Sequence, residues 1–139
     1  MNLPELLADL TTHYNALIRS AASQLNLTSS QAFQLISITN DGIPMSKLAH
    51  RLGLDPSTLT RNIQKLEKLG LVERKHDSYD RRVQRAVLTK QGSEVVNEID
   101  EILLQMNHLI MNQIDLDSQE NIYDVLEKLV WSMDCVREK

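Results

Sequence analysis

The N-terminal segment repeats apolar side chains at alternating steps of four and three residues. The repeating residues are Leu3, Leu7, Leu10, Tyr14, Leu17 and Ala21. Because an α-helix turns once every ~3.6 residues, this spacing places all of them on one face. The pattern is typical of a coiled-coil seam, so we expect a helix that packs against a partner.

Two shorter helices are predicted next. The first covers about residues 29–40 and ends at a turn formed by Asp41 and Gly42. Its apolar surface comprises Ala32, Phe33, Leu35, Ile36 and Ile38. The second covers about residues 46–52, with Gly53 supplying the turn after it. Its inner face comprises Leu48, Ala49 and Leu52.

The stretch "GLDPSTLTRNIQKLEKLGLVERK", which begins at Gly53, contains a fourth helix. Asp55 before Pro56 is a helix start, with an N-cap side chain followed by proline at the first helical position. Gly70 ends the helix after Lys68 or Leu69, because glycine accepts the left-handed conformation at low steric cost. The predicted buried residues, which fall within about 60° on an ideal helix, are Leu59, Ile63 and Leu66.

The opposite face of this helix is polar and basic. Measured from Leu59 at about 100° per residue, five residues lie at about 140–240°; they are Gln64, Ser57, Lys68, Arg61 and Lys65. Such a face is either solvated surface or a docking surface. Since this helix follows a short helix and a glycine-containing turn, the pair is a predicted helix-turn-helix.

A β-hairpin is predicted after Gly70. The segments "LVERKH" and "VQRAVL" are rich in β-branched and apolar residues, and they flank the polar turn-forming stretch "DSYDRR".

The remaining sequence predicts two long helices. Thr89 caps the first, which ends near Ile114. Its apolar residues are Val95, Ile99, Ile102, Leu103, Met106, Leu109 and Ile110. Asp117 or Ser118 caps the second. Its residues Ile122, Leu126, Leu129, Met133 and Val136 repeat the four-and-three spacing of the N-terminal seam.

Charge is divided unevenly along the chain. At 139 residues and 42% hydrophobic content, the chain has the size of one domain with a real core, and its net charge is −4. Residues 45–90 contain eleven Lys and Arg against five Asp and Glu, a net charge of +6, whereas the rest carries −10. A basic block within an acidic chain is the footprint of a module that docks on phosphate.

Other functional classes find little support in the sequence. No apolar run approaches the ~20 residues that cross a bilayer, and no secretory signal is visible, so we expect a cytoplasmic protein. The single Cys135 fits that compartment and is interpreted as an incidental thiol rather than an oxidation sensor. The four histidines form no metal-ligand pattern, and no nucleophile-elbow motif is present. We therefore predict no metal, no cofactor and no enzymatic activity.

The combination of these motifs resembles the MarR family of transcriptional regulators. The resemblance lies in "LTSSQAFQLISI", "MSKLAHRLGLDPSTLTRNIQKLEKLGLVERK" and "DRRVQRAVLTKQG", which cover roughly residues 27–92. It implies a mainly α fold in which a winged helix-turn-helix with a two-stranded β-wing is flanked by dimerisation helices. Within a single domain over residues 1–139, residues 28–90 would form the DNA-binding part, and residues 1–25 and 91–139 the helical dimerisation part of a homodimer.

The resemblance also implies which residues contact double-stranded DNA. The family's recognition helix maps to residues 56–69, and the residues expected at base edges or adjacent phosphates are Ser57, Thr58, Thr60, Arg61 and Gln64. Lys65 and Lys68 are expected to contact phosphate. The family's wing-tip arginine maps to Arg82, which would enter the minor groove. Asp80 is expected to hold a nearby arginine, and Arg81 and Arg85 to contact backbone phosphates.

The function implied is that of a sequence-specific regulator, in the family's commoner mode a repressor. Two recognition helices about 34 Å apart in a twofold dimer would fit an inverted-repeat operator. Relatives often bind small aromatic or phenolic effectors, which would release DNA by changing that spacing. The alternative is a dimeric winged-helix module that binds another protein and has no operator. The uniformly polar or basic outward face and the basic wing favour DNA.

Overall fold

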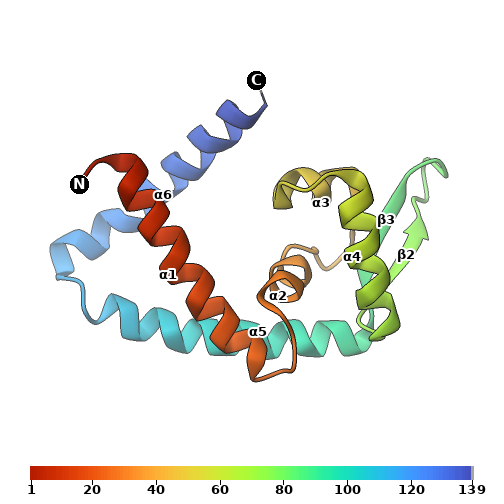
Figure 1. Cartoon of the computed structure of the whole chain (residues 1–139), viewed down its shortest axis with the longest axis horizontal. Coiled ribbons are helices and arrows are strands. Elements are labelled where there is room, and N and C mark those ends of the chain that lie inside the picture. The colour runs from red at the N-terminus through yellow and green to blue at the C-terminus, as the bar shows by residue number, and fades with distance from the viewer. Residues whose placement is uncertain (139) are drawn as a thin grey trace. The chain divides into compact units, whose positions relative to one another are not determined.

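A computed structural model describes residues 1–138, which form six helices and a three-stranded sheet (Figure 1). The elements are α1 (Leu3–Ser23), α2 (Ser29–Ile36), β1 (Ile43–Pro44), α3 (Met45–Leu52), α4 (Pro56–Lys68), β2 (Val72–His76), β3 (Gln84–Leu88), α5 (Lys90–Met111) and α6 (Leu116–Arg137). The chain divides into two compact units at the Leu103–Leu104 bond, within α5. The predicted mainly helical winged fold is confirmed.

The predicted N-terminal helix is confirmed as α1. Asn2 caps it, and Glu5 returns a hydrogen bond to the Asn2 backbone, which completes a capping box. Only the C-terminal part of α1 reaches the core, through Ile18, Ala21 and Ala22. Most seam residues nearer the N-terminus are exposed, with Leu3 at 55%, Leu10 at 55% and Tyr14 at 46%, whereas Leu7 is partly buried.

The prediction that the next helix runs to Asn40 is wrong, because α2 ends at Ile36. The Ser37 hydroxyl donates to the Phe33 carbonyl at 2.6 Å, and the Thr39 hydroxyl donates to the Gly42 carbonyl at 2.6 Å. The helical pattern is lost at Ile38, because its amide donates three residues back, to the Leu35 carbonyl, at 3.2 Å. The chain then turns at Gly42, whose φ of +85° is a conformation that glycine accepts readily.

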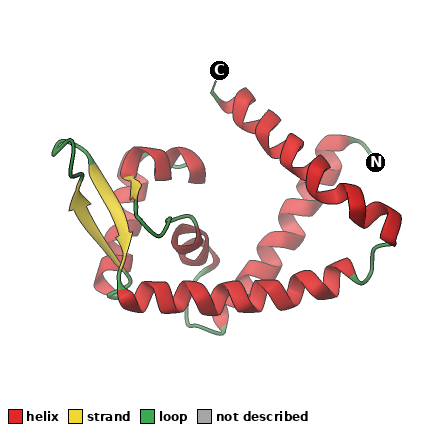
Figure 2. Cartoon of the chain, turned by 180° about the vertical axis from the view of Figure 1, so that it is seen from behind, coloured by secondary structure: helices red, strands yellow, loops and turns green. Residues whose placement is uncertain are grey.

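The sheet has one more strand than the expected two-stranded wing. The predicted hairpin is confirmed as β2 and β3, which pair antiparallel from Val72↔Leu88 to His76↔Gln84. The short strand β1 pairs with the other edge of β3, giving the order β1-β3-β2 (Figure 2). Two residues, one of them proline, offer no alternating pattern from which a strand could be predicted.

The helix-turn-helix consists of α3 and α4. Gly53 ends α3 in the left-handed conformation, and the Leu54 amide donates to the Ala49 carbonyl at 2.9 Å. The predicted start of α4 is confirmed, since Asp55 accepts a hydrogen bond from the Thr58 amide and Pro56 is the first helical residue. Gly70, with φ of +76°, ends α4 as predicted.

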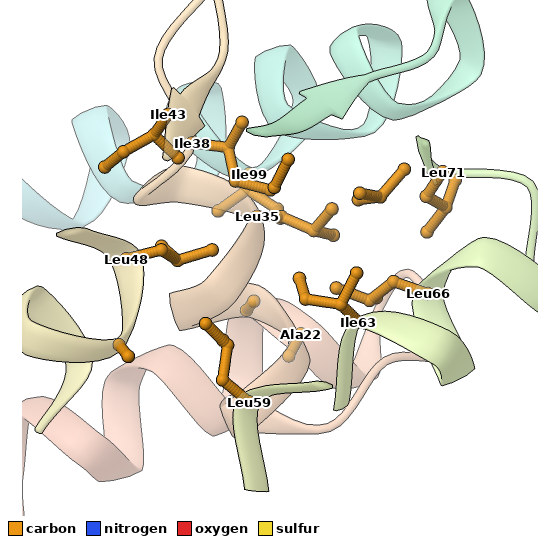
Figure 3. Packing of buried hydrophobic residues seen from close by; sticks show 14 of the residues in the cluster. Ala22, Leu35, Ile38, Ile43, Leu48, Leu59, Ile63, Leu66, Leu71 and Ile99 are labelled. Carbon is orange, nitrogen blue, oxygen red and sulfur yellow. The ribbon is translucent and has the colours of Figure 1, made fainter. Parts of the chain in front are cut away.

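The core of the first unit gathers residues from its helices and its sheet (Figure 3). The contribution of α4 is the predicted one, because Leu59, Ile63 and Leu66 are at most 1% exposed. Fully burying an aliphatic side chain contributes about 1.5–3 kcal/mol. This apolar stripe therefore fixes the rotation of α4 about its axis and leaves the polar face outward.

The start of α5 is hydrogen-bonded to the residue that ends α4. The Thr89 hydroxyl accepts a hydrogen bond from the Gly92 amide at 3.0 Å, which confirms the predicted cap, and it donates to the Gly70 carbonyl at 2.6 Å. The helix ends at Met111 rather than near Ile114, because the amide of Ile114 bonds three residues back, to the Met111 carbonyl.

The second unit contains the end of α5 and α6. The expected cap of α6 at Asp117 or Ser118 is wrong, because Asp115 caps the helix by accepting from the Ser118 amide at 2.9 Å. Within Leu116–Arg137, all of which the structure describes, no residue is buried. Every helix within residues 1–138 falls short of the length and apolar character needed to cross a membrane.

Candidate nucleic-acid interface

The outward face of α4 is polar and basic along its length. The residues on it that are exposed are Ser57, Arg61, Gln64, Lys65 and Lys68. They lie opposite the buried stripe, as the helical rotation predicts. Thr58 and Thr60 are half-buried on the flank of the same helix.

Hydroxyl groups near the start of α4 bond to the protein itself. The Ser57 hydroxyl donates to Asp55 Oδ1 at 2.7 Å, and the Thr58 hydroxyl donates to Asp55 Oδ2 at 2.8 Å. The Thr60 hydroxyl donates to the Pro56 carbonyl, one turn back, at 2.9 Å.

Asp55 is held in its charged form by this network. The Ser57 hydroxyl, followed by the amide and hydroxyl of Thr58, lowers the pKa of the Asp55 carboxyl far below its usual range. Hydrogen bonds to the charged form of an acid stabilise that form. The carboxylate therefore stays ionised at neutral pH and acts only as an acceptor.

Arg61 is linked to the same hydrogen-bond network. Its Nη2 donates to the Thr58 hydroxyl oxygen at 3.3 Å.

The C-terminal end of α4 forms an ion pair with the sheet. Arg74 Nε on β2 donates to Glu67 Oε1 at 3.0 Å, with both side chains about two-thirds buried or more. This ion pair joins α4 to β2, and both elements belong to the first unit.

At the wing tip, Arg82 is exposed but paired. Its Nε and Nη2 both bond to the Asp80 carboxylate at 3.1 Å, and its side chain is 90% exposed. Hydrogen bonds from the Arg82 side chain and amide lower the pKa of Asp80. The expectation that Asp80 holds a nearby arginine is confirmed. The arrangement extends one guanidinium from the tip of the hairpin.

Arg85 occupies a different environment from the other wing arginines. Its guanidinium donates to Asp77 Oδ1 at 3.2 Å and to the Gly42 carbonyl at 2.9 Å, and its side chain is only 26% exposed. In this position Arg85 joins the start of the wing loop, at Asp77, to the turn before β1. Arg81, the other arginine expected at phosphate, is exposed.

The structure assigns positioning roles to residues that the sequence reasoning missed. Asp77 accepts hydrogen bonds from the amides of Tyr79 and Asp80, and these amides together with Arg85 lower the pKa of Asp77. An aspartate that opens a polar turn is a signal for such bonding. The Glu67–Arg74 pair has no comparable local signal, because its partners lie on different elements.

A comparison with protein families identifies the segment that carries most of these residues. Residues 27–83 match the model described as the MarR family. The matched segment belongs to the MarR family. It includes α2 to β2 and the wing tip with Arg82.

Solved structures of the MarR family share the fold over nearly the whole chain. One crystal structure of MarR is 24% identical, with a TM-score of 0.83 over 99% of this chain and 95% of that one. MepR from S. aureus, solved as a DNA complex, is 21% identical, with a TM-score of 0.77 over 95% of this chain and 98% of MepR. PcaV from Streptomyces coelicolor, in complex with its natural ligand, is 23% identical, with a TM-score of 0.74 over 94% of this chain and 92% of PcaV. The chain thus has the fold of a MarR-family transcriptional regulator.

Proposed function

We propose that this protein is a sequence-specific DNA-binding transcriptional repressor that acts as a homodimer on an inverted-repeat operator. The observation that carries the proposal is the outward face of α4, where Arg61, Lys65 and Lys68 stand exposed opposite a fully buried stripe. A helix with this division of faces suits the major groove, which admits an α-helix. The DNA complex of MepR, which shares the fold, supports this use.

The proposed contacts divide between bases and phosphates. Ser57, Thr58, Thr60, Arg61 and Gln64 face base edges or adjacent phosphates, and Lys65 and Lys68 contact phosphate. Arg82, at the exposed tip of the hairpin, enters the minor groove, and Arg81 contacts phosphate. Arg85 contributes chiefly by holding the wing, since its donors are engaged by Asp77 and Gly42.

Exposed apolar surface on α1 and α6 supports the homodimer. On α1, Leu3, Leu6 and Leu10 are each more than half exposed. On α6, the exposed apolar residues are Leu116, Tyr123, Val125, Leu126, Val130, Trp131, Met133 and Val136. Large exposed apolar patches mark association surfaces. We therefore assign residues 1–25 and 91–139 to dimerisation and residues 28–90 to DNA binding.

A small-molecule effector is the proposed source of regulation. PcaV, which shares the fold, is in complex with its natural ligand. An aromatic or phenolic effector would release DNA from this protein by favouring a spacing of the two recognition helices that does not fit the operator. Such a ligand shifts the equilibrium only by its difference in affinity for the two spacings.

The test is fluorescence anisotropy at about 0.15 M salt, with the duplex just upstream of this protein's gene and a scrambled duplex of equal length. We expect the native duplex to bind about a thousandfold more tightly. If both duplexes bind weakly and with little dependence on salt, the alternative of a winged-helix protein-interaction module replaces the proposal. Equal, weak binding with a steep salt dependence would place the operator elsewhere and call for selection from a random duplex pool.

A further inference from the structure

We propose that Ser57 reads an exocyclic amino group, that of adenine or cytosine, in the major groove, because Asp55 takes up the only proton that its hydroxyl can donate. The inference rests on the proposed function and specifies how the same helix reads DNA. Asp55 is not itself expected to contact DNA. Its role is to orient the neighbouring hydroxyl so that this group accepts a hydrogen bond from DNA rather than donating one.

The direction of the Ser57 hydrogen bond follows from the chemistry of its partner. A hydroxyl has one proton to donate and two lone pairs that accept. Asp55 Oδ1 lies 2.7 Å from the Ser57 oxygen and, as an ionised carboxylate, has no proton. The hydroxyl proton therefore lies between the two oxygens. The lone pairs of Ser57, which is exposed, are left for an outside donor.

The other hydroxyls on this part of α4 are oriented in the same way. Thr58 donates to Asp55 Oδ2 at 2.8 Å, and Thr60 donates to the Pro56 carbonyl at 2.9 Å. Thr58 also accepts from Arg61 at 3.3 Å, which uses one of its lone pairs. All three hydroxyls thus donate within the protein and can only accept a hydrogen bond from a ligand. Ser57 is the most accessible of the three.

Phosphate is a poor partner for this surface. Phosphate oxygens only accept hydrogen bonds, and their negative charge is repelled by the Asp55 carboxylate. The helix N-terminus, which often binds anions, offers few donors here. Pro56 lacks an N–H group, and the amides of Thr58 and Leu59 bond to Asp55.

Among the base edges in the major groove, only two groups donate hydrogen bonds. These are the N6 amino group of adenine and the N4 amino group of cytosine, whereas guanine and thymine present acceptors. Arg61, which has only donors, complements Ser57 by reading guanine. The first turns of α4 therefore present an acceptor beside a donor, and each requires a different base.

The experiment begins with selection of duplexes from a random pool by the wild-type protein and by Ser57→Ala. We expect the wild type to select adenine or cytosine at one pair of symmetric positions, and Ser57→Ala to lose that preference while keeping the others. In the selected operator, adenine is then replaced by purine, or cytosine by its analogue without the amino group. The wild type should lose about threefold to tenfold in affinity per half-site, as for one hydrogen bond, and Ser57→Ala should lose nothing further.

Asp55→Gly tests the positioning role separately. Glycine is accepted at an N-cap with little loss of stability, and thermal unfolding of the variant checks that the helix start is kept. The substitution removes the carboxylate oxygen to which the Ser57 hydroxyl donates, so that hydroxyl can turn and donate its proton toward DNA. The amino preference should weaken in Asp55→Gly. Lys68→Ala is the control, because it should lower affinity for all duplexes and leave the selected bases unchanged.

Two results would overturn the inference while leaving the proposed function intact. One is selection of the same bases by the wild type, Ser57→Ala and Asp55→Gly. The other is a loss in Ser57→Ala that disappears when one phosphate is replaced by an uncharged methylphosphonate, since this would place the hydroxyl at the backbone. If the wild type selects no sequence at all, the proposed function fails first and base reading by Ser57 fails with it.

Discussion

Gly92, in the first turn of α5, lies against the backbone of the chain just before β2. A Cβ atom added at Gly92 would lie 1.9 Å from the Leu71 carbonyl oxygen and 2.9 Å from its carbon. Alanine normally favours a helix over glycine by ~1 kcal/mol, but here it would meet backbone that cannot rotate away. We expect Gly92→Ala to lower the free energy of unfolding by about 1–3 kcal/mol, as overpacking does, measured by urea denaturation.

Ser93→Ala is the matched control for this substitution. Ser93 is the next residue of the same helical turn and is exposed. Its replacement adds no atom near Leu71 and should change the free energy of unfolding by less than about 0.5 kcal/mol. Equal stability of Gly92→Ala and the wild type would show that α5 can move away from Leu71.

Asp55 makes stability depend on pH in a direction that its hydrogen bonds determine. The Ser57 hydroxyl, with the Thr58 amide and hydroxyl, lowers the pKa of Asp55 in the folded protein below the unfolded value of about 3.9. This stabilisation is complete above the unfolded pKa and is lost as pH falls toward the folded pKa. We expect the melting temperature to decrease as the pH is lowered past about 4. The decrease should be less steep in Asp55→Asn, which has no titrating group at this position.

Part of this acid dependence should remain in the variant. The pKa values of Asp77, Asp80 and Asp115 are also lowered, by hydrogen bonds from nearby backbone amides and arginines. When melting temperature is measured from about pH 7 to pH 2, it should therefore fall in both proteins, and it should fall more steeply in the wild type than in Asp55→Asn. Parallel profiles would mean that the Asp55 bonds persist equally in the unfolded chain.

At the scale of elements, α4 should separate base reading from phosphate binding. We expect Arg61→Ala to cost about 1–3 kcal/mol of binding free energy on the operator and to relax its sequence preference. Lys68→Ala, in the last turn of the same helix, should weaken binding to all duplexes similarly and reduce the salt slope by about one. Anisotropy titrations with operator and scrambled duplexes at several salt concentrations measure both. Equal losses of Arg61→Ala on the two duplexes would remove Arg61 from the base-reading residues.

How far the sequence predicts an element depends on whether its determinants are local. The bounds of α4 were predictable because the cap, the first-turn proline and the closing glycine all lie within or next to it. Its buried stripe was predictable for the same reason, since Leu59, Ile63 and Leu66 follow the helical period. The exposed side chains of the candidate interface then follow from rotation about the same axis.

The errors arose where side chains or distant segments decide the structure. Near the end of α2 the chain turns through hydrogen bonds of Ile38 and Thr39, and α6 is capped by Asp115, earlier than either predicted cap. β1 exists only through its pairing with β3, which no local pattern reveals. The engagement of Arg85 by the Gly42 carbonyl, 43 residues away, has the same origin.

At the scale of the whole molecule, the exposed apolar face of α6 predicts the state of association. Leu126 and Val130 lie within about 40° of each other on an ideal helix, and they are 40% and 66% exposed. In the proposed homodimer, a second copy of the chain covers this face. We expect sedimentation equilibrium to give twice the chain mass of 15.9 kDa, and Val130→Glu to shift the protein toward monomer, because it would bury an unpaired charge in the interface.

Lys128→Glu is the control, since it introduces a carboxylate on the polar side of the same helix, at about 160° from Val130 and beside the exposed Asp124. It should remain dimeric. Because an operator with two half-sites requires two recognition helices, Val130→Glu should also lose operator affinity although α4 is unchanged, whereas Lys128→Glu should keep it. A monomeric Val130→Glu that binds the operator as tightly as the wild type would show that one winged module is sufficient. A wild type that is itself monomeric at micromolar concentration would remove the twofold dimer from the proposed function.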